Sequence, residues 1–241
     1  MRSCIYLLLL LSSCATIYQP RKTIYYDYRI HKIESDAGVI SILKPYSDSI
    51  NKVMNIVVGV TSETLEKKQP NGSLGLVLVQ AMQQMAAVKY NTKVDAAFIN
   101  NGGIRIPTLA KGNVTVGKVY EIMPFDNLLI LQTISGKTLQ DFIDLIARKG
   151  GWPVSGITFT IASGKATQVL VGGKPIDPLT MYTIANSDYI ANGGDDADML
   201  RPVPQRNDNV LLRDIFIEFF KMKYAAGELI EAPKELPIQK L

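Results

Sequence analysis

The chain has 241 residues, of which 47% are hydrophobic and 20% are charged. This balance excludes an intrinsically disordered chain, and the length is sufficient for one sizeable hydrophobic core. The net charge of +4 is spread along the sequence. Because no basic block carries interleaved aromatic residues, we do not expect a nucleic-acid polymer as a partner.

The first residues are typical of an export signal. A short basic segment precedes the apolar residues 5–11, which are too few to span a bilayer as a helix. Residues 11–14, Leu-Ser-Ser-Cys, resemble the lipobox of bacterial lipoproteins. We therefore expect a signal peptide over residues 1–13 and a lipid anchor on Cys14, which would hold the protein to a membrane of the cell envelope, facing the periplasm or the exterior. The alternative is an ordinary signal peptide with a chance cysteine.

The expected mature chain begins with a polar tether over residues 14–32. The other cysteine, Cys4, lies in the segment to be removed, so the mature domain would have no disulfide, thiol metal site or cysteine nucleophile. The single histidine, His31, lies in the tether, where a solvated role is favoured over a role as ligand or base. The folded domain is expected over residues 33–227, followed by a proline-rich, peripheral tail over residues 228–241.

Helical and strand-like segments then alternate along the domain. Helix-compatible spacing covers residues 33–54, and a short β-branched strand follows at 54–60. A polar connection over residues 61–72 leads to Ser73, a candidate cap for a helix that continues to about residue 85. A second buried strand is expected at residues 94–100.

The second half of the domain continues the alternation. Residues 112–120 predict a loop followed by a strand or short helix, and residues 137–148 predict a helix with one apolar face. Another long helix is expected over residues 209–224. Further strands are expected at residues 127–133, 157–161, 166–171 and 182–186. With no internal repeat and no linker, we expect one α/β domain, an α+β-type mixed sheet with flanking helices.

One segment combines features of an anion-binding loop. An apolar run ends in Asn100 and Asn101, and two glycines and Ile104 precede Arg105. Glycines let the backbone approach a ligand closely, and an arginine presents a planar fork of donors to phosphate.

Two later segments supply aromatic and acidic groups. Phe125 follows a proline, so its ring either faces a planar base from a stiffened loop or plugs the core at a strand start. Residues 186–196 form a glycine-containing loop with Tyr189 and Asp195, and a carboxylate can accept hydrogen bonds from two ribose hydroxyls. In isolation that loop would also suit calcium or a solvated turn, but its spacing does not match the EF-hand template.

These segments, taken in order, resemble the C-terminal, substrate-binding domain of the 5'-nucleotidase family. The resemblance includes residues 112–117 and 134–139 and extends over about residues 35–225. It implies a compact α/β fold that clamps a nucleoside, with Phe125 and Tyr189 stacking on the two faces of the base. By position, Asp195 would hold the ribose hydroxyls and Arg105 would face the phosphate.

The same resemblance implies further contacts and shows three departures, one of which is Tyr189 in place of the more usual phenylalanine, a change that keeps the ring. Asn100 and Asn127 would give polar contacts at the base or sugar, and Gly156 would line the same cleft. Asn101 replaces a third glycine, and the family's additional arginines are absent. Lys67 or Lys68 would take their place at the phosphate, although an ammonium lacks the arginine fork.

The family's catalytic half is a separate metallophosphatase domain, with several histidine, aspartate and asparagine ligands around two metals. One histidine cannot assemble such a centre, so we expect the chain to be inactive alone and to contain no cofactor or metal site. The favoured hypothesis is the nucleotide-recognition half of a split 5'-nucleotidase whose partner, a metallophosphatase-domain protein, holds divalent metals. The alternatives are a non-catalytic surface lipoprotein that binds nucleotides or nucleosides and a scaffold that only mediates interactions.

Overall fold

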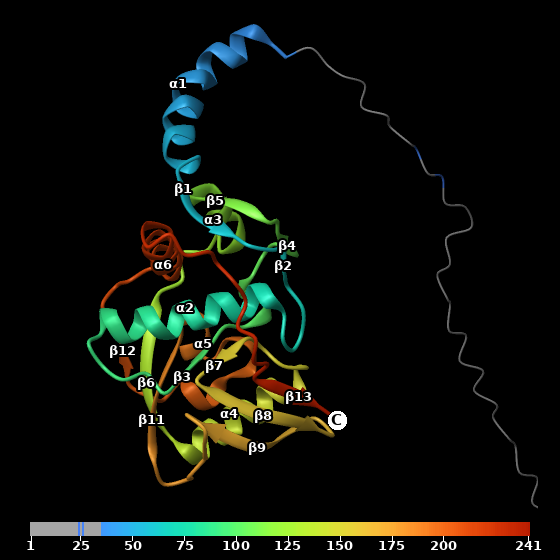
Figure 1. The fold of residues 1–241 in the computed structure, drawn as a ribbon, viewed down its shortest axis with the longest axis vertical. Helices are drawn as coiled ribbons and strands as arrows, with labels where there is room; N and C mark the ends of the chain where they lie inside the picture. Colours follow the sequence, from blue (N-terminus) through green and yellow to red (C-terminus); the bar gives the residue numbers. More distant parts are fainter. Residues whose placement is uncertain (1–23, 25, 27–34) are drawn as a thin grey trace, which may run out of the picture. The chain divides into compact units, whose positions relative to one another are not determined.

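The computed structural model describes residues 24, 26 and 35–241 (Figure 1). The expected signal peptide, Cys14, His31 and nearly all of the tether lie outside the described residues. Two compact units make up the chain, Met1–Leu43 and Lys44–Leu241, and the second contains the sheets. No helix among the described residues is long and apolar enough to cross a bilayer.

The elements follow the predicted alternation. The helices are α1 (Ala37–Met54), α2 (Ser73–Lys89), α3 (Val116–Ile122), α4 (Gly136–Arg148), α5 (Asp188–Ala191) and α6 (Leu212–Ala225), with the 3₁₀ turns η1 (Asn101–Gly103), η2 (Gly194–Asp196) and η3 (Asp198–Leu200). The strands are β1 (Val57–Thr61), β2 (Leu65–Glu66), β3 (Ala96–Phe98), β4 (Thr108–Leu109), β5 (Gly112–Thr115), β6 (Leu129–Ser135), β7 (Val154–Ser155), β8 (Ile157–Ala162), β9 (Lys165–Val171), β10 (Lys174–Pro175), β11 (Met181–Ser187), β12 (Gln205–Arg206) and β13 (Ile238–Lys240).

A mixed five-stranded sheet forms the centre of the second unit. Its strand order is β12-β6-β11-β3-β7, with β11 parallel to β3 and antiparallel to β6. A second, four-stranded sheet has the order β10-β9-β8-β13. Mixed sheets with flanking helices confirm the predicted fold class.

The central sheet separates two hydrophobic cores, because successive strand residues point to opposite faces. On β11, Ile184 belongs to one core and Ala185 to the other. Helices α2 and α6 cover the Ala185 side, and α4 and the four-stranded sheet cover the Ile184 side. β3 and most of β6 are therefore buried on both faces, which explains why these two strands lack an alternating apolar pattern.

Two helix starts differ from the prediction. Gly72, not Ser73, precedes the first turn of α2, and the Ser73 hydroxyl instead accepts a hydrogen bond from the Glu66 amide at 2.8 Å. Helix α6 begins at Leu212 and not at residue 209, because Asn209 has a left-handed backbone with φ of 58°. A residue in that conformation cannot lie inside a right-handed helix.

The C-terminal tail is not peripheral, so that expectation was wrong. Ile230 and Ile238 are each 2% exposed, and β13 pairs in parallel with β8. The Asn71 side chain donates to the Ile238 carbonyl at 2.6 Å and accepts from its amide at 3.3 Å. The proline-rich segment therefore completes the second sheet and part of the core.

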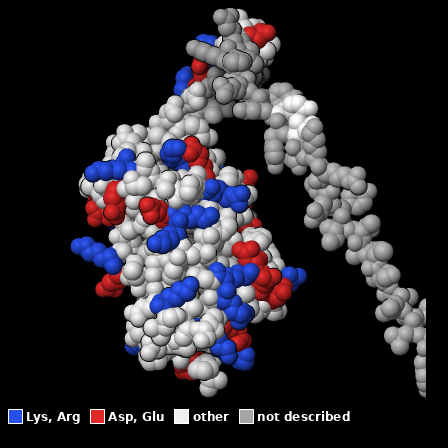
Figure 2. All heavy atoms as spheres, turned by 90° about the vertical axis from the view of Figure 1, so that its right-hand side faces the viewer, with Lys and Arg blue, Asp and Glu red and all other residues white. Residues whose placement is uncertain are grey.

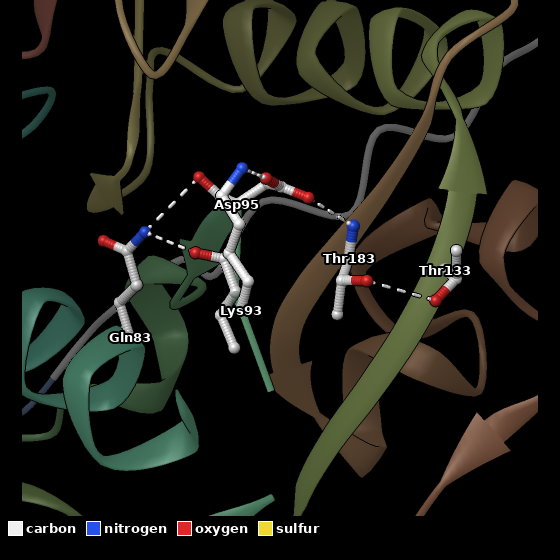
Figure 3. Close-up of polar contacts among 6 residues, drawn as sticks. Gln83, Lys93, Asp95, Thr133 and Thr183 are labelled. Carbon is white, nitrogen blue, oxygen red and sulfur yellow. Dashed lines mark hydrogen bonds and ion pairs between the residues drawn. The ribbon is translucent and has the colours of Figure 1, made fainter. Parts of the chain in front are cut away.

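Polar contacts extend the pairing of β3 and β11 beyond β3 (Figure 3). The Asp95 amide donates to the Thr183 carbonyl at 2.8 Å, and the Asp95 carboxylate accepts from the Thr183 amide at 2.9 Å. Lys93 pairs with the other carboxylate oxygen at 2.6 Å, and Gln83 on α2 donates to the Asp95 carbonyl. These bonds fix the amino ends of the two parallel strands.

Charged side chains of both signs lie close together on the surface. On the face in Figure 2, lysine and arginine side chains lie among aspartate and glutamate side chains. Several pairs are one helical turn apart, such as Lys137 with Asp141 at 2.8 Å. Exposed pairs of this kind contribute little to stability, typically about 0.3–0.5 kcal/mol.

Candidate functional site

The candidate site lies at the carboxyl ends of the two parallel strands. β3 continues into Asn100 and η1, while β11 continues into Tyr189 on α5 and then into η2. Ligands in α/β proteins bind at the carboxyl ends of parallel strands, because the loops that follow the strands converge there. The sequence segments that seemed separate are thus neighbours in the fold.

A cavity of about 290 Å³ opens between these loops and the loop that precedes β6. This volume is slightly below the roughly 300 Å³ lower end for small-molecule sites, so the cavity suits part of a ligand, such as a base and its sugar. The structure brings six predicted site residues together here. The lining residues are Asn100, Gly102, Gly103, Arg105, Phe125, Asn127, Tyr189 and Asp195.

Asn100 is seated against the glycines of η1. Its side chain is nearly buried, and a Cβ at Gly103 would lie 2.8 Å from the Asn100 amide oxygen. Only glycine leaves space for the amide in this position. The Asn100 amide nitrogen then donates to Asp195 Oδ2 at 2.7 Å.

Asp195 is held in a tight turn by the Tyr189 hydroxyl. The turn contains Gly193 with φ of 88° and Asp195 with φ of 52°, both left-handed. Tyr189 donates to Asp195 Oδ1 at 3.1 Å, and the Asp195 amide donates back to the Tyr189 hydroxyl at 3.3 Å. Each carboxylate oxygen therefore accepts one protein bond. Because a carboxylate offers about four acceptor sites, lone pairs remain for ligand hydroxyls.

The Tyr189 ring packs directly on Gly194. A Cβ added at Gly194 would lie 2.5 Å from the ring. The backbone of the turn therefore supports the ring of Tyr189, a residue that is 47% exposed and lines the cavity.

The second aromatic ring is contributed by the loop before β6. Phe125 is 44% exposed, and the Arg105 guanidinium carbon lies 5.4 Å from the centre of its ring. Arg105 also donates to the Gly102 carbonyl at 3.3 Å. The exposed ring favours a ligand-facing role over the core-plug alternative for Phe125.

Asn127 is positioned by contacts on both sides of its loop. The Asp188 carboxylate accepts a hydrogen bond from the Leu128 amide at 3.1 Å, which ties the loop to α5. The Asn127 carbonyl accepts from the Leu212 amide at 2.9 Å, which ties it to α6. These two hydrogen bonds fix the segment before β6 beside the cavity.

Arg213 on α6 contacts three consecutive residues of the Phe125 loop. It donates to the carbonyls of Pro124 and Phe125, each at 3.3 Å, and pairs with the Asp126 carboxylate at 2.7 Å. Burial acts to lower the pKa of Arg213, but the bond to Asp126 and the neighbouring Tyr120 outweigh it, so the pKa is raised. The guanidinium therefore stays charged.

The turn that carries Asp195 is also tied to α4. Lys149, which follows the helix, pairs with the neighbouring Asp196 at 2.7 Å. The hydrogen bond and charge of Lys149 lower the pKa of Asp196 below its ordinary value.

Three residues predicted for the site do not line the cavity. Gly156 lines a separate cavity near the C-terminal tail, and a Cβ there would meet the Asp95 carbonyl oxygen at 2.2 Å, so its role is close packing on β3. Lys67 donates to the Ile104 carbonyl at 2.8 Å, and Lys68 is exposed. Neither lysine lines the cavity.

Sequence reasoning assigned no role to three residues that support the lining. Arg213, Asp188 and Gly194 touch other protein groups and carry no ligand-like pattern of their own. A usable signal existed for Arg213, because it lies three residues before Phe216 and seven before Phe220, on the buried face of α6. Within residues 35–241, no cluster of three or more histidine, cysteine, aspartate or glutamate side chains is arranged to hold a metal.

Comparison with known proteins identifies a matching family and several relatives. Residues 52–202 match the profile of the family described as 5'-nucleotidase, C-terminal domain. The chain is 30% identical over 173 residues to a 5'-nucleotidase of Vibrio vulnificus, a match that covers 68% of this chain and 30% of that protein. It is 34% identical over 169 residues to endonuclease YhcR of Bacillus subtilis, covering 66% of this chain and 13% of that protein. The chain thus spans less than a third of the length of these relatives.

A solved structure of a 5'-nucleotidase has a similar fold. The 5'-nucleotidase precursor from Thermus thermophilus superimposes with a TM-score of 0.71 at 24% identity, covering 83% of this chain and 42% of that one.

Proposed function

The chain belongs to the 5'-nucleotidase C-terminal domain family, and from this premise we propose that it is the nucleotide-recognition half of a split 5'-nucleotidase. In this proposal a separate metallophosphatase-domain protein supplies divalent metals and hydrolyses the phosphate ester, a step of nucleotide catabolism. The observation that carries the proposal is the cavity shared by Phe125, Tyr189, Asp195 and Arg105.

Each lining group has a defined task in this proposal. The Phe125 and Tyr189 rings stack on the base, a contact worth about 1–3 kcal/mol per base at nucleic-acid sites. The remaining lone pairs of Asp195, together with Asn100 and Asn127, accept or donate hydrogen bonds at the sugar and base. Arg105 turns from its contact with Phe125 toward the phosphate, to which it offers a bidentate fork.

The test combines the full chain with a candidate metallophosphatase partner, metal and AMP. We expect phosphate release above that of the partner alone, and we expect the chain alone to release none at enzymatic rates. A mixture with Phe125→Ala should lose most of the increase, because stacking no longer holds the base. An unchanged rate in the wild-type mixture contradicts the split-enzyme proposal.

The same experiment distinguishes the alternative function. If calorimetry detects AMP or adenosine binding but no partner raises hydrolysis, the chain is a non-catalytic surface lipoprotein that binds nucleotides or nucleosides. In either case we propose a lipid anchor on Cys14 that holds the protein in the cell envelope. Membrane sedimentation that persists after Cys14→Ser contradicts the anchor.

A further inference from the structure

We propose that Arg213 is a positioning residue that holds the Phe125 ring in stacking geometry, an inference that rests on the proposed function. Arg213 lies on α6, behind the loop, and does not line the cavity. It therefore acts through the loop and not through a contact with ligand.

The contacts of Arg213 restrain the loop at three successive points. Its guanidinium reaches the carbonyls of Pro124 and Phe125 and the carboxylate of Asp126. The two carbonyls are the backbone groups that flank the Phe125 side chain. A rigid, planar fork with five donors can satisfy such acceptors together, which a lysine ammonium on a flexible stem cannot do with the same geometry.

The fold makes the guanidinium rigid and leaves the loop exposed. The Arg213 side chain is only 7% exposed, whereas that of Asp126 is 80% exposed. The Arg213 guanidinium carbon also lies 4.1 Å from the centre of the Tyr120 ring on α3, a cation–π contact. The buried Arg213 guanidinium thus holds a loop whose residues 124–126 are exposed. Without Arg213, the Phe125 ring should become mobile.

The first test follows the ring without any ligand. The chain has one tryptophan, Trp152, which is 2% exposed in the core. Labelling Phe125→Trp with 5-fluorotryptophan adds a second ¹⁹F resonance, which reports on the loop while Trp152 reports on the core. We expect Arg213→Met to narrow the loop resonance and shift it toward the unfolded position, with the Trp152 resonance unchanged. A loop resonance that keeps its width and position overturns the proposal.

The second test measures binding of AMP and adenosine by calorimetry. Arg213→Met should weaken both ligands by the same factor, about threefold to tenfold, because the base stack is common to them. Arg213→Lys should fall between Met and wild type. In a Phe125→Ala background, Arg213→Met should cause no further loss, since residues that act through one contact are not additive. An equal further loss in that background, or wild-type affinity of Arg213→Met, overturns the proposal.

Two further variants keep the outcome interpretable. Asp126→Asn weakens the exposed end of the ion pair without disturbing the core, and should give a smaller loss of the same kind. Arg206→Met is the control for the loss of an arginine over a ring, because the Arg206 guanidinium carbon lies 4.9 Å from the centre of the Tyr90 ring in another part of the fold. If the wild-type chain binds neither AMP nor adenosine, the proposed function fails, while the ¹⁹F result still decides whether Arg213 restrains the loop.

Discussion

At the scale of single residues, the candidate site depends on polar groups whose capacity is only partly used. Asp195 accepts one bond from Asn100 and one from Tyr189, which orient the carboxylate before any ligand arrives. Preorganisation of this kind lowers the entropic cost of binding. The Tyr189 hydroxyl therefore has a task in this chain beyond that of its ring.

The contact between Gly194 and Tyr189 yields a prediction about ring placement. A methyl group at Gly194 would lie 2.5 Å from the ring, so Gly194→Ala should push the half-exposed ring away from the turn. We expect AMP and adenosine affinity to fall about tenfold in calorimetry, with little change in melting temperature because the ring is not in the core.

The control for this change is Gly38→Ala on the exposed helix α1, which should leave affinity unaltered. Wild-type affinity of Gly194→Ala would mean that the turn does not determine where the Tyr189 ring lies.

At the scale of elements, the short C-terminal strand β13 is held to the rest of the fold by three kinds of contact. β13 joins the second sheet by parallel pairing with β8, and Ile238 enters the core that also contains Trp152. Asn71, from the connection before α2, fixes the strand through both backbone groups of Ile238. Ile238 is thus held by strand pairing, by burial in the core and by two hydrogen bonds with the Asn71 side chain.

Ile238→Ala should therefore lower the free energy of unfolding by about 2–5 kcal/mol, the usual cost of deleting a buried aliphatic side chain. Equilibrium unfolding in urea would measure the loss. Leu241→Ala, three residues away and 91% exposed, is the matched control and should stay within about 0.5 kcal/mol of wild type. Similar values for the two variants would show that β13 adds no packing energy.

The strengths of sequence reasoning also differ between elements. Long apolar strands such as β6 and amphipathic α4 were predicted to within two residues, because local pattern and burial agree there. β13 was missed because a strand of three residues is too short to show an alternating apolar pattern. In addition, its pairing partner β8 lies more than seventy residues earlier in the sequence. Gly156 lies beside the right strands but serves their packing, a distinction that only the tertiary structure makes.

At the scale of the whole molecule, the topology explains why distant motifs belong together. The parallel pairing of β3 with β11 places the segment after residue 99 beside the segment after residue 187. The motifs and the family resemblance that they carry were enough to predict six of the eight residues that line the cavity. The supports behind them could not be assigned in the same way, because the role of Arg213 depends on a loop almost ninety residues earlier and that of Gly194 on how the Tyr189 ring folds back onto the turn.

Binding at this site should stabilise the second unit as a whole, since the lining comes from three segments far apart in the sequence: those that follow β3 and β11 and the loop that precedes β6. A ligand present at about 100 times its Kd adds about 2.7 kcal/mol to the free energy of unfolding. For a domain of this size, about 2–4 °C per kcal/mol corresponds to a rise in melting temperature of roughly 5–11 °C with AMP. Scanning calorimetry would measure the rise. The double variant Phe125→Ala, Tyr189→Ala should show almost no rise with AMP, because it lacks both rings that stack on the base. Inorganic phosphate should have little effect on the wild-type chain, because phosphate has no base to stack. An equal rise in the double variant would place AMP elsewhere on the protein.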